Sequence, residues 1–131
     1  MTGIGRTGRG TRDRGAVMVE LALILPILVM LLIGIIDFGR AFNAQVSIQG
    51  AAREGARSLA LGRSSAEVAT AVNGAAGAVV PSGIAQTPCP TPVLATSQAT
   101  VTVSSTFDFN IPFVSLGTRT LNATARMRCG L

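Results

Sequence analysis

The amino-acid sequence predicts an α+β fold with a long N-terminal helix, a second short helix and a small antiparallel sheet. Three observations lead to this prediction. A basic leader is followed by a long apolar run, helical periodicity then continues through two further segments, and apolar and polar residues alternate in the C-terminal third. These changes divide the chain into four parts, which are residues 1–15, 16–36, 37–62 and 63–131.

Residues 1–15 are rich in glycine, arginine and threonine and nearly lack apolar side chains. This composition predicts a disordered basic leader peptide. Four arginines precede the apolar run, whereas Arg40 alone lies within a similar distance after it. The positive-inside rule therefore predicts a cytoplasmic N-terminus and an exported C-terminal part.

The run from Ala16 to Ile36 contains a single charged residue, Glu20. As a helix this run would be roughly 30 Å long, which matches the hydrocarbon core of a bilayer. We therefore expect one transmembrane helix, and Pro26 should kink or loosen it because proline removes a helix hydrogen bond.

Helical periodicity continues beyond the membrane span, so residues 37–62 are expected to form a protruding, amphipathic half of the same helix. Its apolar stripe should help to form the core of the exported domain, and Gly62 suits the helix end. The stripe consists of Phe38, Phe42, Val46 and then Gln49 or Ala52. Glycines also recur along the rod and favour close approach of neighbouring helices, at Gly34, Gly39, Gly50 and Gly55.

Residues 63–131 are expected to form a small exported α+β domain. Ser64 and Glu67 have the spacing of a capping box and predict the start of a second helix, whose apolar stripe runs to Val79 before Pro81. The segment 81–98 reads as a loop or an edge segment. Alternation then predicts two antiparallel strands, over residues 101–109 and 120–127, joined by an apolar connection.

The two cysteines, Cys89 and Cys129, both lie on the predicted exported side. An oxidising compartment and a small core favour a disulfide between them. The alternative is a pair of unlinked thiols.

The composition argues against an enzyme. The chain has no histidine and no tyrosine, and its sequence shows no lysine, so the commonest general acids and bases are missing. We expect no catalytic residue, no metal, no cofactor and no small-molecule substrate. The net charge of +5 is concentrated in the leader, and the chain lacks tryptophan and tyrosine for base stacking. Nucleic acid is therefore not an expected partner.

Glu20 is a costly group at the edge of a membrane helix unless a cation pairs with it. Cleavage between Gly15 and Ala16 would create an α-amine one helical turn away, which is charged at neutral pH. That amine could pair with Glu20 of its own chain or of a neighbouring chain. Alternatively, Glu20 reaches the cytoplasmic interface and pairs with Arg14.

Two motifs at a fixed spacing resemble a known family. The run DFGRA contains Asp37, Phe38, Gly39 and Arg40, and the run AAREGAR follows ten residues later with Arg53, Glu54, Gly55 and Arg57. Together with Gly15 and Glu20 they resemble the TadE-like family, the pseudopilins of tight-adherence (Flp-type) pilus systems. Members often carry an aromatic residue directly after the glutamate, where this chain has Leu21.

The resemblance implies a pilin-like fold and a membrane-inserted precursor that a prepilin peptidase cuts after Gly15. The implied role is that of a minor pilin or assembly factor in the bacterial inner membrane. Its implied partners are the prepilin peptidase, other pilins and pseudopilins, the membrane platform with its secretion ATPase, and the lipid bilayer. The competing hypothesis is an unprocessed single-pass membrane protein whose exported domain binds an envelope partner.

Overall fold

The structure is a computed structural model that describes residues 10–109 and 117–130. The chain divides into two compact units, Met1–Ile36 and Asp37–Leu131. We call them the N-terminal unit and the C-terminal unit and describe each by itself. The first part of the predicted leader and most of the connection predicted between the last two strands lie outside the described residues.

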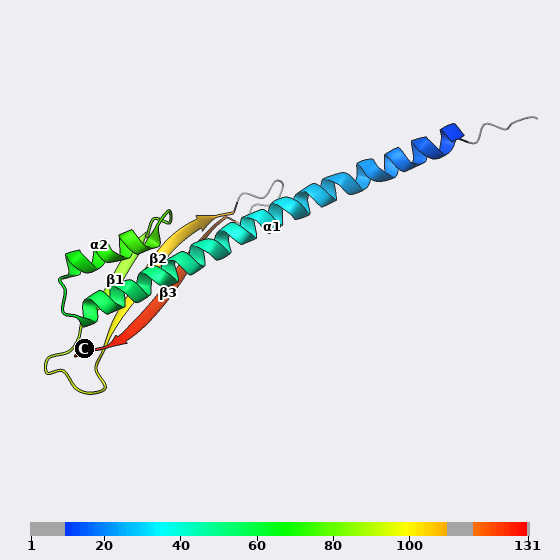
Figure 1. Ribbon diagram of the computed structural model, residues 1–131. Coiled ribbons are helices and arrows are strands. Elements are labelled where there is room, and N and C mark those ends of the chain that lie inside the picture. The colour runs from blue at the N-terminus through cyan, green and yellow to red at the C-terminus, as the bar shows by residue number, and fades with distance from the viewer. Residues whose placement is uncertain (1–9, 110–116, 131) are drawn as a thin grey trace, which may run out of the picture. The chain divides into compact units, whose positions relative to one another are not determined.

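Helix α1 spans Gly10–Ala60 (Figure 1). It continues through Pro26, so the proline does not end it. The expectation that the helix starts near Ala16 is wrong, because it begins six residues earlier. Adding residues to an existing helix costs far less than nucleating a new one, so arginine and threonine extend it toward the leader.

The C-terminal end of α1 is where the sequence predicts it. Gly62 has a φ of 77°, a left-handed conformation that glycine adopts without strain. The N–H of Gly62 donates to the carbonyl of Leu59 at 3.0 Å, and the N–H of Arg63 donates to that of Ser58 at 3.2 Å. These bonds satisfy carbonyl groups that the ending helix leaves without a partner.

The N-terminal unit consists, in its described part, of the helical residues 10–36. Most of its apolar side chains are exposed, and Ile33 is half-buried. The helix is long and apolar enough to cross a membrane, which is compatible with a single-pass membrane anchor.

The C-terminal unit begins with the Asp37–Ala60 part of α1 and continues with helix α2, Ser65–Ala76. The predicted capping box is confirmed, because Ser64 Oγ accepts from the N–H of Glu67 while the Glu67 carboxylate accepts from the Ser64 hydroxyl and N–H. These bonds, with Arg63 nearby, lower the pKa of Glu67. Gly77 ends α2 before Val79, so the helix is shorter than its apolar stripe suggests.

The sheet has three antiparallel strands, β1 (Gly83–Thr87), β2 (Gln98–Asp108) and β3 (Thr118–Arg128), with β2 in the middle (Figure 1). The two predicted strands correspond to β2 and β3. β1 lies within the segment read as a loop or an edge segment, and it is an edge strand. It pairs with residues 100–104 of β2. Its short sequence mixes apolar and polar residues and does not predict this tertiary contact.

The core of the C-terminal unit lies between the two helices and one face of the sheet. Its members are mostly alanine and valine, with Ile48 and Leu59 as the larger side chains of α1. Val101 and Val103 of β2 are fully buried, and their register partners on β3 are Ala125 and Ala123. Small residues on facing elements allow these backbones to approach closely.

The predicted core stripe of α1 is wrong at its first three positions, whereas Ala52 is buried as predicted. Phe38, Phe42 and Val46 are 69%, 65% and 51% exposed. The face that packs on the sheet is instead the small-residue face, which includes Ala41, Ala44, Ile48, Ala51, Ala52 and Ala56. Periodicity shows that a helix has an apolar face, but here the helix also has a face of small residues that fits closer to a sheet.

Candidate functional site

The predicted processing segment lies in α1. Gly15 and Ala16 are exposed helical residues, and a side chain added at Gly15 would meet no atom within 4 Å. Glu20 is also exposed and lies one helical turn after Ala16. Within the described residues no ion pair joins Glu20 to Arg14. The structure therefore places Gly15, Ala16 and Glu20 on an accessible segment of the N-terminal unit.

The DFGRA motif forms an ion pair at the start of the C-terminal unit. Asp37 is buried, and Arg40 Nη1 donates to its Oδ1 at 3.2 Å. The Arg40 guanidinium also lies 5.8 Å from the centroid of the Phe107 ring, a cation–π distance. The motif thereby links the first turn of this unit to the end of β2, while Phe38 and Gly39 face outward.

The AAREGAR motif has two faces with different roles. Ala51, Ala52, Gly55 and Ala56 are buried against α2 and the sheet. Arg53, Glu54 and Arg57 are exposed, and Arg57 lies 4.0 Å from Glu54 in a weak surface pair. The motif therefore combines a close-packing surface with a charged one.

Gly55 has a packing reason that the sequence did not reveal. A Cβ atom at this position would lie 2.6 Å from Val72 Cγ2 and 3.1 Å from Val101 Cγ1. The glycine is thus the point at which α1, α2 and β2 meet. Gly34, Gly39 and Gly50 have open space where a Cβ would be, so they differ from Gly55 in this respect.

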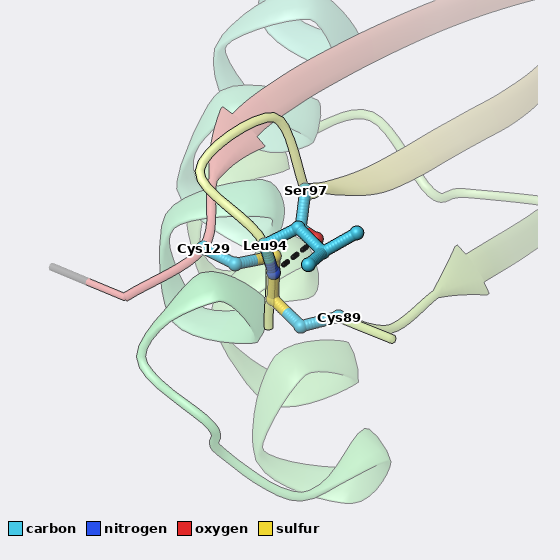
Figure 2. Close-up of a disulfide and its surroundings, with 4 residues drawn as sticks. All are labelled: Cys89, Leu94, Ser97 and Cys129. Carbon is cyan, nitrogen blue, oxygen red and sulfur yellow. Dashed lines mark hydrogen bonds between the residues drawn. A yellow bond between two sulfur atoms is a disulfide. The ribbon is translucent and has the colours of Figure 1, made fainter. Parts of the chain in front are cut away.

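The predicted disulfide joins Cys89 to Cys129, with 5.9 Å between their Cα atoms (Figure 2). It links the segment after β1 to the residue that follows β3. The loop beside it is held by a hydrogen bond from the N–H of Leu94 to Ser97 Oγ at 2.9 Å, and the N–H of Cys129 donates to the Ser97 carbonyl at 3.0 Å. The disulfide and these bonds fasten the end of the sheet opposite Phe107.

Phe107 is a partner of Arg40 that the sequence does not predict. Alternation marked Phe107 as a strand residue, but no local pattern indicates which helix residue a strand end will meet. Over residues 14–109 and 117–130 no group of three or more acidic, histidine or cysteine side chains could hold a metal ion.

Comparison with known proteins gives one match. No curated protein and no solved structure is significantly similar to this chain. A family model described as TadE-like protein matches residues 15–57, the segment that holds Gly15, Glu20 and both motifs. Over these residues the chain is similar to TadE-like proteins, which agrees with the resemblance drawn from DFGRA and AAREGAR.

Proposed function

We propose that this protein is a TadE-like pseudopilin that takes part in the assembly of a tight-adherence pilus. The observation that carries the proposal is the family match over residues 15–57, since this segment joins the exposed apolar helix to both motifs. The protein would be anchored in the bacterial inner membrane with its C-terminal unit exported. It would act with other pilins and pseudopilins and with the membrane platform of the system.

The proposal includes cleavage by a prepilin peptidase after Gly15. In the uncut chain the Gly15–Ala16 bond lies inside α1, so the peptidase has to unwind the helix locally. Glycine weakens a helix by about 1 kcal/mol relative to alanine, so Gly15 lowers the cost of this local unwinding. Exposure of Gly15 and Ala16 leaves the bond accessible.

Cleavage would then give Glu20 a partner. The new α-amine of Ala16 carries a positive charge at neutral pH, and it lies one helical turn from Glu20 of its own chain. In a neighbouring chain the same amine would set the offset between two helices. An unpaired charge costs about 3 kcal/mol at the centre of a membrane helix and less at the edge, where Glu20 lies, so this pairing would favour assembled subunits.

The first prediction concerns the cut. When the full-length protein is expressed with its cognate prepilin peptidase, the membrane-extracted product should begin at Ala16. Intact-mass and N-terminal analysis measures this, and expression without the peptidase provides the control. A product that retains residues 1–15 in the presence of the peptidase contradicts the proposal and supports an unprocessed single-pass membrane protein.

The second prediction concerns Glu20. The variant Glu20→Ala should remain in the membrane but lose at least tenfold in piliation, because its helices no longer gain the amine–carboxylate pair. Pilus counts and membrane fractionation of the native bacterium measure the two effects. Val19→Ala changes the neighbouring membrane residue without removing a charge and should leave piliation unchanged. Normal piliation of Glu20→Ala would show that the pairing argument is wrong.

A further inference from the structure

One edge of the sheet has main-chain groups that the described residues leave mostly unpaired. The Ser104 carbonyl accepts from the N–H of Ser82, so Ser104 directs its main-chain groups toward β1. In an antiparallel pair the opposite residue then directs its own groups away. The partner of Ser104 is Asn122, and alternation extends this orientation to Thr124 and Arg126.

A second hydrogen bond, at the C-terminal end of β3, gives the same orientation for the main-chain groups of β3. The N–H of Cys129 donates to the Ser97 carbonyl, which places the odd-numbered residues of β3 in bonds to β2. Among the described residues no strand pairs with the even-numbered side of β3. The one recorded bond to this edge comes from α1, where Gln45 Nε2 donates to the Asn122 carbonyl at 3.0 Å.

Helix α1 forms the wall of a polar groove along this edge. An open cavity of about 310 Å³ is lined by Gln49 and Arg53 of α1 and by residues 122–125 of β3. A four-residue step on a helix covers about 6 Å and a two-residue step on a strand covers about 6.6 Å, so helix and strand stay in register. The Gln45 side chain occupies the Asn122 carbonyl at one end of this edge, and the cavity extends along residues 122–125.

Positive charge lies in the groove and on the opposite face of the same strand edge. Arg53 lies on the helix side, and Arg126 belongs to the sheet face that points away from α1. Three other arginines of the C-terminal unit, Arg40, Arg57 and Arg63, have recorded ion pairs. Within the described residues Arg53 and Arg126 have no ion pair, and neither do Arg119 and Arg128 at the two ends of β3. A strand added at this edge would therefore meet uncompensated positive charge, from Arg53 on the α1 side and from Arg126 on the opposite face.

We infer that the β3 edge binds an extended acidic peptide segment of a partner protein, which adds to the sheet as a fourth strand. Strand addition supplies main-chain hydrogen bonds to Thr124 and Arg126. Neighbouring side chains of a strand point to opposite faces. Two successive acidic residues in the partner would therefore meet Arg53 on one face and Arg126 on the other.

The test uses the full-length protein in detergent micelles and a defined probe. The probe is the acetylated peptide Thr-Val-Thr-Val-Asp-Glu-Thr with a fluorescent label, and its counterpart carries Lys-Lys in place of Asp-Glu. A third peptide has the acidic sequence with alternate main-chain nitrogens methylated, which blocks strand pairing but keeps the charge. Fluorescence anisotropy measures binding, and amide hydrogen exchange at Thr124 and Arg126 reports strand addition.

The acidic peptide should bind, should slow exchange at Thr124 and Arg126 at least tenfold, and should lose at least tenfold in affinity in Arg53→Gln. The matched control Arg63→Gln removes an arginine from another part of the unit and should change affinity less than twofold. The methylated and lysine peptides should not bind measurably. Equal binding of the methylated peptide would overturn the inference in favour of charge attraction alone.

Two further results would also overturn it. One is the absence of binding of the acidic peptide at millimolar concentration. The other is protection of Thr124 and Arg126 that grows with protein concentration without peptide, which would assign the edge to a second copy of this chain. None of these measurements depends on cleavage after Gly15 or on piliation, so the inference and the proposed function fail separately.

Discussion

Replacing Cys89 and Cys129 by alanine should lower the free energy of unfolding of the C-terminal unit by about 4 kcal/mol in the chain-entropy model, given a sequence separation of 40 residues. The disulfide closes a loop that contains all of β2 and β3, so without it the unfolded chain gains freedom in the part that must form the sheet. Small domains have only about 5–15 kcal/mol of stability in total. The C-terminal unit of the double variant should therefore be only marginally stable.

Amide hydrogen exchange at Val101 and Val103 in the micelle-bound full-length protein measures this loss. Both residues are fully buried on the central strand, so their exchange reports opening of the core. A loss of about 4 kcal/mol corresponds to exchange that is roughly a thousandfold faster. Thiol alkylation of the unreduced wild-type protein should label neither cysteine. Unchanged exchange in the double variant would show that the disulfide contributes little to stability.

The variant Gly55→Ala should destabilise the C-terminal unit by about 2 kcal/mol. A Cβ atom at position 55 would lie 2.6 Å from a methyl group of Val72. The helix cannot shift to relieve this contact without a clash, because Val101 also lies against position 55. Both valines are fully buried and stiff about χ1, so neither can turn away cheaply. Overpacking of this kind costs about 1–3 kcal/mol, and the better helix propensity of alanine offsets only part of it.

Gly50→Ala is the matched control, because Gly50 lies on the same helix and has open space where a Cβ would be. This variant should raise stability by up to about 1 kcal/mol through helix propensity alone. Combining Gly55→Ala with Val72→Ala should recover part of the loss, since it removes the closest contact. Hydrogen exchange at Val103 measures all three variants. Equal stability of Gly55→Ala and Gly50→Ala would show that the junction can relax.

The parts of the fold that the sequence predicts are those controlled by local chemistry. Ser64 and Glu67 form their capping box because both partners lie within one turn. Gly62 ends α1 because its backbone can adopt a positive φ. The alternation in residues 101–109 and 120–127 predicts two strands because a half-buried strand shows its period directly.

The parts that the sequence did not predict depend on contacts between distant residues. β1 exists because β2 offers it a free edge, and its own sequence is too short and mixed to indicate a strand. Helix α1 packs on the sheet through alanines and Gly55 rather than through Phe38 and Phe42. The small residues let the helix lie closer to the sheet than the large aromatic side chains would. The helix start at Gly10 differs from the prediction because a long existing helix extends easily.

The candidate site shows the same division. The sequence by itself determined the apolar span and the two motifs, and it singled out Glu20 and the Gly15–Ala16 bond as candidates, because each of these features consists of neighbouring residues whose chemistry can be recognised without coordinates. Only the tertiary structure decided that Arg40 reaches Phe107, that Gly55 sits between two valines, and that Arg53 faces the edge of β3. These contacts join residues from different elements, and the free energy that selects them comes from packing the whole unit.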